Sequence, residues 1–338
     1  MLELKHDPSK CLACNSYDCL VKCQYLHLSR EEAEVEVKKL ISGEDSRVLH
    51  ECVTCYACEE YCRRGNHPFY FIVEQQERKG ILTAPKPIVK QWVQLAIPMG
   101  EQVRAARKPL ISMCFFPGIE NRVQSKLFEG VDVIMGRHIF CNLVYLHFAK
   151  SSLIKERLPK ITEAIAQHGV DEVVFFHDEC YSTFTHYAEA IGLKVPFKPI
   201  HLFEYLYRRL KELEDEIRPL NLKVAYQRPC SSRLTPEKEH WVDDIFNLIG
   251  VERVKRVYDR ENALCCGSIF KLLGRYELSI DVQRRNLDDM VKAGAEVCVF
   301  NCPNCYWTLA EKVAKLGIKP LFMSDLCRLA IGEKPEGW

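Results

Sequence analysis

Five cysteines in the C-terminal part of the chain follow one ordered spacing, and no other feature constrains the fold as much. A single cysteine is followed after 34 residues by a Cys-Cys pair and Gly267, and after 35 more residues by C-P-N-C. The five are Cys230, Cys265, Cys266, Cys302 and Cys305. Buried structural cysteines are the alternative, but adjacent cysteines strain a disulfide and fill a core poorly. The spacing therefore predicts a metal-cluster site with thiolate ligands.

The whole chain carries 18 cysteines among 338 residues, and disulfides are the rival explanation for this number. The first residues, MLELKHDPSKC, lack the apolar stretch of a signal peptide. The cysteines also fall into groups with metal-type spacing, and thiolates are the ligands that iron-sulfur clusters select. We therefore expect a cytoplasmic protein that uses its cysteines to hold metal.

Charge and hydropathy limit the partners that the chain can have. Lys and Arg number 47 against 46 Asp and Glu, so we expect no nucleic-acid partner, which would favour a basic excess. No uncharged apolar stretch approaches the roughly 18 to 20 residues of a membrane span. We expect no transmembrane segment, although the protein can lie at the inner face of a membrane by docking on a partner.

The first 70 residues hold eight cysteines in two groups. The second group follows C-x2-C-x2-C-x3-C, the run of two-cluster ferredoxins, in which the fourth cysteine of each run ligates the other cluster. This rule predicts one 4Fe-4S cluster on Cys52, Cys55, Cys58 and Cys23, and another on Cys11, Cys14, Cys19 and Cys62. The first run departs from the pattern, because residues 15–18 widen its middle gap and its loop must bulge. Two all-cysteine zinc sites are the alternative.

Helix signals surround these groups. Ser29 and Glu32 form a capping box ahead of an apolar face that ends at Gly43, and residues 68–81 read as a helix entered through Pro68. We interpret residues 1–81 as an α-helical two-cluster ferredoxin domain. Residues 82–109, which mix proline with basic residues, are interpreted as a connector.

From residue 110 onward the pattern alternates between strands and amphipathic helices, which favours α/β layers with parallel strands. The expected strands cover residues 111–116, 131–135, 172–176, 222–227, 254–259 and 296–300. Together with the helical N-terminal domain this gives an α+β chain overall.

The α/β region contains an internal duplication. Residues 173–184 match 298–309 at an offset of 125, and Phe140-Cys141-Asn142 matches Cys265-Cys266-Gly267 at the same offset. Residues 191–197 also match 316–322. We therefore expect two lobes related by a pseudo-two-fold axis, a first repeat over 110–215 and a complete second repeat over 216–338.

The first repeat lacks most of the five thiols. We match His177 to Cys302, Phe140 to Cys265 and Gly118 to Cys230, and only Cys141 and Cys180 persist. Zinc on Cys141, His177 and Cys180, with Cys114 as a further candidate, is one interpretation. Loss of the site with retention of packing is another, and a proton-donor role for His177 near the second-repeat cluster is a third.

The motifs LCCGSIF, PCSSR and CPNCY resemble those of the CCG-domain iron-sulfur proteins, typified by the catalytic subunits of heterodisulfide reductase. The resemblance covers nearly the whole chain: the ferredoxin domain is similar to the C subunit of that enzyme, and residues 110–332 to its B subunit. Such a fusion resembles the D subunit of the membrane-linked heterodisulfide reductases. It is also similar to the K subunit of the sulfite-reduction-associated complex and to iron-sulfur subunits of glycolate, lactate and glycerol-3-phosphate dehydrogenases.

The resemblance implies that Cys230, Cys265, Cys266, Cys302 and Cys305 hold a noncubane 4Fe-4S cluster that reduces a disulfide in one-electron steps. In heterodisulfide reductase both repeats carry such clusters, whereas only the second repeat is complete here. A single-cluster mechanism, closer to that of the K subunit, is therefore expected.

Two functions follow as hypotheses. In the first, a flavoprotein, hydrogenase or membrane cytochrome supplies electrons to the ferredoxin clusters, and the noncubane cluster acts on a thiol/disulfide couple, small molecule or protein. In the second, the chain only carries electrons between a flavin dehydrogenase and a quinone-linked partner. A scaffold subunit with zinc at the CCG site is a weaker third hypothesis.

Other residues are expected to have minor roles. Asn301, Asn304 and Ser268 are candidates to donate hydrogen bonds to cluster sulfur. Cys298 and Cys327 are expected to fill the core, and no glycine motif indicates a nucleotide site.

Overall fold

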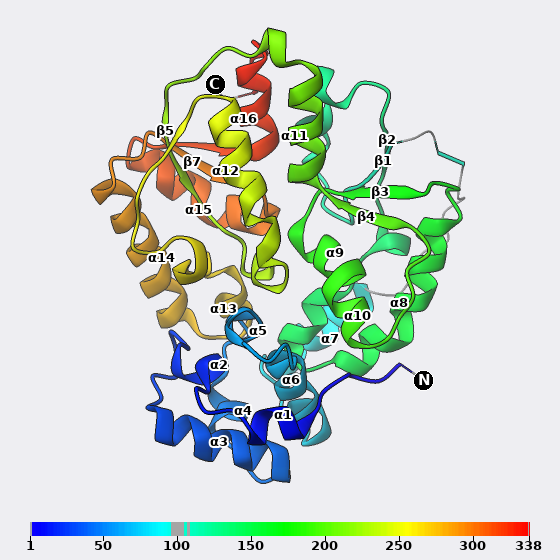
Figure 1. Cartoon of the computed structure of the whole chain (residues 1–338), viewed down its shortest axis with the longest axis vertical. Coiled ribbons are helices and arrows are strands. Elements are labelled where there is room, and N and C mark those ends of the chain that lie inside the picture. Colours follow the sequence, from blue (N-terminus) through cyan, green and yellow to red (C-terminus); the bar gives the residue numbers. More distant parts are fainter. Residues whose placement is uncertain (1, 96–104, 107–108, 337) are drawn as a thin grey trace.

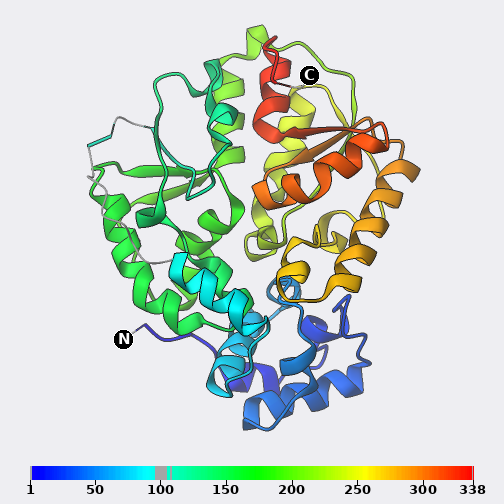
Figure 2. The same ribbon diagram turned by 180° about the vertical axis from the view of Figure 1, so that it is seen from behind.

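The computed structural model describes residues 2–95, 105–106, 109–336 and 338. Its N-terminal part is helical and lies below two α/β lobes, in contact with both (Figures 1 and 2). The helices of this part are α1 (Pro8–Leu12), α2 (Asp18–Val21), α3 (Arg30–Ser42), α4 (Arg47–Glu51), α5 (Ala57–Tyr61) and α6 (Pro68–Arg78).

The predicted helix signals in this part are confirmed. Ser29 and Glu32 exchange the two hydrogen bonds of a capping box, and Gly43 ends α3 with φ +78°, a conformation that a side chain would strain. Helix α6 begins at Pro68, whose missing N–H costs nothing in the first turn. A small core of leucines, valines and Ala33 from α2, α3 and α4 packs under these helices.

Two parallel four-stranded sheets follow, which confirms the predicted α/β layers. Their strand orders are β2-β1-β3-β4 and β6-β5-β7-β8, so the two lobes share one topology. The first sheet consists of β1 (Leu110–Ser112), β2 (Asp132–Ile134), β3 (Glu172–Phe175) and β4 (Lys198–His201). The second consists of β5 (Lys223–Tyr226), β6 (Glu252–Arg253), β7 (Val297–Phe300) and β8 (Lys319–Phe322).

Helices cover these sheets. The first lobe carries α8 (Ser151–Ala166), α9 (Asp178–Ser182), α10 (Ala188–Ala190) and α11 (Leu202–Glu212). The second carries α12 (Glu239–Leu248), α13 (Ser268–Leu272), α14 (Tyr276–Lys292), α15 (Pro303–Lys315) and α16 (Met323–Ala330). Helix α7 (Lys86–Leu95) lies inside the segment interpreted as a connector, whose residues 96–104 and 107–108 lie outside the described part.

The strand predictions needed three corrections. The strand expected over 254–259 is wrong, because the pairing strand is the two-residue β6 just before it. Strands β4 and β8 were missed; each carries a proline and follows a glycine turn, which weakens a strand pattern. The match of 191–197 with 316–322 is also out of register, since β4 and β8 pair so that Lys198 corresponds to Lys319.

The sheet register also corrects one equivalence between the repeats. Leu110 lies beside Val173, and Ala225 lies beside Cys298, the residue that corresponds to Val173. Strands β1 and β5 are thus offset by 115 residues. Phe115, not Gly118, therefore occupies the position of Cys230. The division at residues 110 and 216 remains a prediction.

One large apolar core joins the three parts of the molecule. It contains Tyr56 and Phe69 from the helical part, Cys141 and Phe175 from the first lobe, and side chains of the second lobe around Cys305. The predicted thiol site therefore lies where all three parts meet. Cys298 in β7 and Cys327 in α16 are fully buried, as expected for core residues.

Candidate metal centres

The five second-lobe cysteines come from three loops that converge beside β5 and β7. Cys230 begins the short helix η7 (Cys230–Leu234), Cys265 and Cys266 precede α13, Cys302 caps α15 and Cys305 lies in its first turn. Their thiols contact one another in the order Cys230, Cys265, Cys266, Cys305, Cys302. Four are buried and Cys230 is half-buried. The structure thus brings the predicted set together.

Gly267 holds the Cys-Cys pair in its conformation. Its φ is +86°, and its N–H donates to the Cys265 sulfur over 3.3 Å. A Cβ at this position would lie 2.8 Å from Nε2 of Gln283 and 2.9 Å from the carbonyl oxygen of Ser279. Only glycine adopts this backbone conformation without strain and also fits the space beside Ser279 and Gln283.

Two of the five thiols favour the thiolate form. Hydrogen bonds from the Cys265 and Cys305 thiols lower the pKa of Cys266 to about 6 in spite of burial. The thiol of Cys305 and the nearby imidazole of His177 likewise lower the pKa of Cys302 to about 6. Thiolates are the form that binds metal, whereas contacts with neighbouring thiols and burial raise the pKa of Cys230, Cys265 and Cys305 well above the ordinary value.

His177 reaches this site from the first lobe. It caps α9, and its imidazole lies at the Cys302 thiol. Burial opposes its charged form, but the Cys302 thiolate and the Glu179 and Asp178 carboxylates raise the pKa of His177 to about 9. The side chain is 1% exposed. His177 of the first lobe therefore faces a second-lobe thiol, and its role as a proton donor stays a prediction.

Asp178 fixes this segment between the lobes. Its buried carboxylate pairs with Nζ of Lys238 at 2.6 Å and accepts hydrogen bonds from Ser232 Oγ and Asn301 Nδ2 at 2.6 and 2.8 Å. The expectation that the Asn301 side chain donates to sulfur is wrong, because its amide bonds Asp178 and the Phe176 carbonyl instead. For Ser268, it is the backbone N–H that donates a hydrogen bond to the Cys266 sulfur, and this bond helps to lower the pKa of that thiol.

The first lobe has its own compact thiol group. The sulfurs of Cys114, Cys141 and Cys180 all lie within 4.8 Å of one another, and all three residues are buried. Of the residues predicted as zinc ligands, Cys141, Cys180 and the further candidate Cys114 lie together, whereas His177 lies at the Cys302 thiol. Cys114 neighbours Phe115, the equivalent of Cys230, so a shift of one residue along the loop supplies the third thiol.

The eight N-terminal cysteines lie close together in an arrangement consistent with the two crossed sets, which remain a prediction. A cavity of about 20 Å³ is lined by Cys23, Cys52, Cys55 and Cys58, and also by Cys19 of the other predicted set. Cys11, Cys14, Cys19 and Cys62 lie close enough that each thiolate of the set disfavours ionisation of Cys19. The fold therefore places Cys23 beside the cysteines of the second run and Cys62 beside those of the first run.

Backbone and amide groups donate to these sulfurs. Tyr17 N–H donates to Cys14, and its φ of +49° marks the bulge expected in the first run. Thr54 N–H donates to Cys52. Asn66 donates from Nδ2 to Cys11 at 3.0 Å and from its backbone N–H to Cys62 at 3.4 Å, which links the two runs. Asn66 carries no spacing signal and was missed from the sequence.

The helical part meets the second-lobe site directly. A gap too narrow to hold a water molecule is lined by Cys55 of one predicted cluster and by Cys230 and Cys265 of another. Tyr25 and Arg233 line the same space. Tyr25 is close to the thiols of both Cys55 and Cys265. Residues of the two predicted clusters therefore share one small enclosure.

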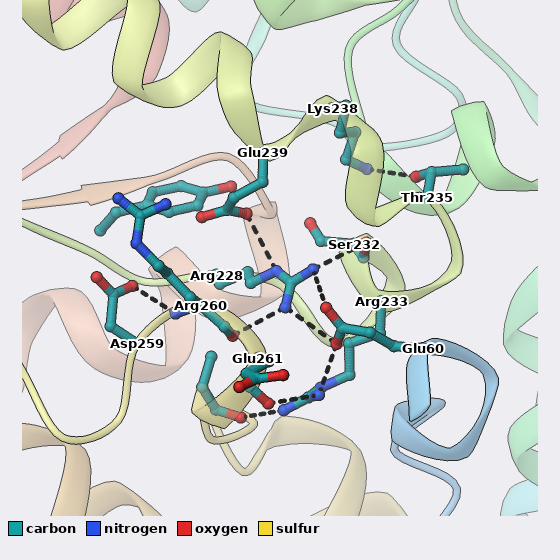
Figure 3. A network of polar contacts seen from close by, with 12 residues as sticks. Glu60, Arg228, Ser232, Arg233, Thr235, Lys238, Glu239, Asp259, Arg260 and Glu261 are labelled. Atoms are coloured by element: carbon teal, nitrogen blue, oxygen red, sulfur yellow. Dashed lines mark hydrogen bonds and ion pairs between the residues drawn. The ribbon is translucent and has the colours of Figure 1, made fainter. Parts of the chain in front are cut away.

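A buried ion cluster fixes this contact (Figure 3). The carboxylate of Glu60 pairs with Arg228 at 2.9 Å and with Arg233 at 2.8 Å. Glu60 lies between Cys58 and Cys62, whereas the two arginines flank Cys230 in the sequence. Arg228 also pairs with Glu239, and Arg233 donates to the carbonyls of Glu261 and Ala263. The network ties two cysteine loops together and was missed from the sequence.

The second-lobe thiol site lies in a segment that is similar to a domain of known proteins. Residues 224–310, which contain the five second-lobe cysteines, match the CCG cysteine-rich domain. The chain is 29% identical over 154 residues to the B subunit of the ferredoxin:CoB-CoM heterodisulfide reductase of Methanosarcina mazei, a match that covers 40% of this chain and 51% of that protein. The chain thus contains a CCG domain, is distantly similar to that reductase component and spans about half its length.

Solved structures give weaker matches. A hypothetical protein from Helicobacter pylori superposes with a TM-score of 0.49 and 13% identity over 82% of this chain and 61% of that one. An aspartate racemase of Picrophilus torridus gives a TM-score of 0.31 with 10% identity, over 70% and 96% of the two chains. Among the described residues, no helix has both the length and the apolar character needed to cross a bilayer.

Proposed function

We propose that this chain is an electron-transfer and catalytic subunit of a heterodisulfide reductase-like complex, an oxidoreductase acting on sulfur. Two 4Fe-4S clusters in the helical part would pass electrons to a noncubane 4Fe-4S cluster on Cys230, Cys265, Cys266, Cys302 and Cys305. The observation that carries the proposal is the enclosure shared by Cys55, Cys230 and Cys265. A short separation between cluster ligands is what transfer within one chain requires.

The chemistry of the donor set fits iron better than zinc at these sites. Soft thiolates select iron-sulfur clusters, and five thiols exceed the four ligands of a structural zinc ion. Among the described residues, the second-lobe thiols also form no group as compact as that of the first lobe. The wider spacing is consistent with a cluster of several metal atoms.

Reduction of a disulfide consumes two electrons and two protons and yields two thiols. When bound, the clusters supply single electrons. The chain's own residues would position the sulfur and balance its negative charge. The His177 imidazole faces Cys302, and Glu179 lies 3.9 Å from His177 and 3.7 Å from His147. Phe116 packs edge-on against His177 and extends toward Trp307, which is half exposed.

A carrier without catalysis is the second candidate. The burial of Cys265, Cys266, Cys302 and Cys305 favours it, because electrons reach a buried cluster whereas a substrate needs access. In that case the chain would link a flavin dehydrogenase to a quinone or membrane cytochrome partner, at the inner face of the membrane.

Addition of a thiol to the oxidised protein separates the two functions. If sulfur substrates bind at the second-lobe site, a small thiol should produce a new paramagnetic signal, and the alcohol analogue of that thiol should not. Electron paramagnetic resonance of the anaerobic full chain measures this. Identical spectra with thiols, disulfides and alcohol would support the carrier and overturn catalysis.

We further propose that Cys114, Cys141 and Cys180 bind zinc. Tetrahedral ligation with Zn–S bonds of about 2.3 Å needs sulfurs roughly 3.8 Å apart, and the group requires little contraction to reach this. Sulfur-ligated zinc should be present at one atom per chain and absent from Cys141→Ser, as measured by elemental analysis with zinc X-ray absorption. Equal sulfur-ligated zinc in the variant would exclude this site.

A further inference from the structure

A second group of metal-ligand side chains lies outside all the cysteine sites, at the seam between the helical part and the first lobe. Glu59 comes from α5, His67 caps α6 and His186 lies in the π-helical segment η5 (Thr183–Tyr187). One atom from each side chain falls within 4.8 Å of the other two. Two segments far apart in sequence, residues 59–67 and η5, thus converge on one point.

The distances fit a single metal ion. Oε2 of Glu59 lies 3.1 Å from Nδ1 of His67 and 3.9 Å from Nε2 of His186. Zinc bonds of about 2.0 to 2.2 Å in a tetrahedron place neighbouring ligand atoms roughly 3.3 to 3.6 Å apart. A hydrogen bond explains the first distance, but 3.9 Å is too long for one. A shared cation accounts for both.

The surrounding contacts have the form of an outer shell that orients metal ligands. The other carboxylate oxygen of Glu59 accepts hydrogen bonds from the N–H groups of Phe69 at 2.7 Å and Tyr70 at 3.3 Å. The buried Tyr70 hydroxyl lies 2.8 Å from Nδ1 of His186. Partners of this kind fix the ring of a metal-bound histidine and leave its other nitrogen for the metal.

The site is open on one side. The side chain of Glu59 is 2% exposed, whereas those of His67 and His186 are 18% and 26% exposed. An ion can therefore enter from solvent, and a fourth coordination position remains for water. Imidazole ligands favour zinc over magnesium or calcium, which prefer oxygen.

We propose that Glu59, His67 and His186 bind one Zn²⁺ ion, which joins the helical part to the first lobe. The proposal does not depend on the function assigned to the cysteine sites. It places a metal with nitrogen and oxygen ligands beside Cys58 but outside the predicted cluster, so its loss should leave the iron content unchanged.

The anaerobically purified full chain, incubated with Zn²⁺ and desalted, tests the site. Zinc X-ray absorption should show one ion per chain with only nitrogen and oxygen ligands, distinct from sulfur-ligated zinc. His67→Ala and His186→Ala should each lose this ion and keep their iron. His50→Ala is the matched control, because His50 pairs with Asp45 at 2.8 Å and has no third ligand nearby in the described structure.

Tyr70→Phe provides a milder variant that keeps all three ligands. Loss of an outer-shell partner typically weakens metal affinity about 10- to 100-fold, and zinc titration should show a decrease of this size. Absence of nitrogen- and oxygen-ligated zinc from the wild-type chain would overturn the proposal, a result that requires no variant to fold. Full retention of that zinc by His186→Ala would overturn it equally.

Discussion

Replacement of Cys305 by serine is expected to remove about four iron atoms per chain and to abolish any response to thiols. Cys305 contacts both Cys266 and Cys302, so its sulfur connects two other members of the second-lobe group. The hydroxyl of serine is a poor ligand for iron in these clusters. Cys305 is buried in the first turn of α15. Serine and cysteine are similar in volume, so the fold should persist.

Cys298→Ala is the matched control for this experiment. Cys298 is a fully buried cysteine in β7 of the same lobe, and its thiol is influenced by burial and Arg256 and by none of the five second-lobe thiols. Its replacement should lower stability through lost packing but leave the iron content intact. An unchanged iron content in Cys305→Ser, measured with the same assay, would remove this residue from the proposed ligand set.

Replacement of Glu60 by alanine is expected to destabilise the chain by about 3 kcal/mol and to slow transfer of electrons to the second-lobe site. Arg233, whose side chain is 4% exposed, would lose its carboxylate partner. Of its two carboxylate partners, Arg228 would keep only Glu239. An unpaired buried charge is costly, and the contact between the helical part and Cys230 would loosen. Anaerobic denaturant unfolding and the rate of reoxidation after reduction of the helical part measure the two effects.

Glu51→Ala controls for removal of an acidic side chain from the same part of the chain. Glu51 pairs with Arg47 on the surface, with 43% and 46% of the two side chains exposed. Such a pair contributes at most about 1 kcal/mol. Similar losses of stability in the two variants, with unchanged reoxidation in Glu60→Ala, would show that the buried network does not fix the junction.

Short spacings in the sequence predicted which cysteines lie together, because residues close along the chain or after adjacent strands are brought near one another by the fold. The crossed sets of the helical part and the convergence of Cys230, Cys266 and Cys305 follow this logic. The capping box of Ser29 was equally local and was confirmed.

Contacts between distant segments could not be predicted in the same way. His177 was matched to Cys302 by alignment, but only the packing of one lobe on the other shows that the two side chains meet. Cys114 was named only as a further candidate for the first-lobe group, and only the fold shows that its sulfur lies with those of Cys141 and Cys180. Glu60 meets Arg228 and Arg233 across more than 160 residues, and nothing in their spacing indicates a pair.

The central claim is that the second-lobe thiols hold a third iron-sulfur cluster beside those of the helical part. A count of iron in anaerobically purified full-length protein tests it most directly. Three clusters predict about 12 iron atoms per chain. A count of about 8, the content of the helical part alone, would contradict the claim and leave a two-cluster electron carrier.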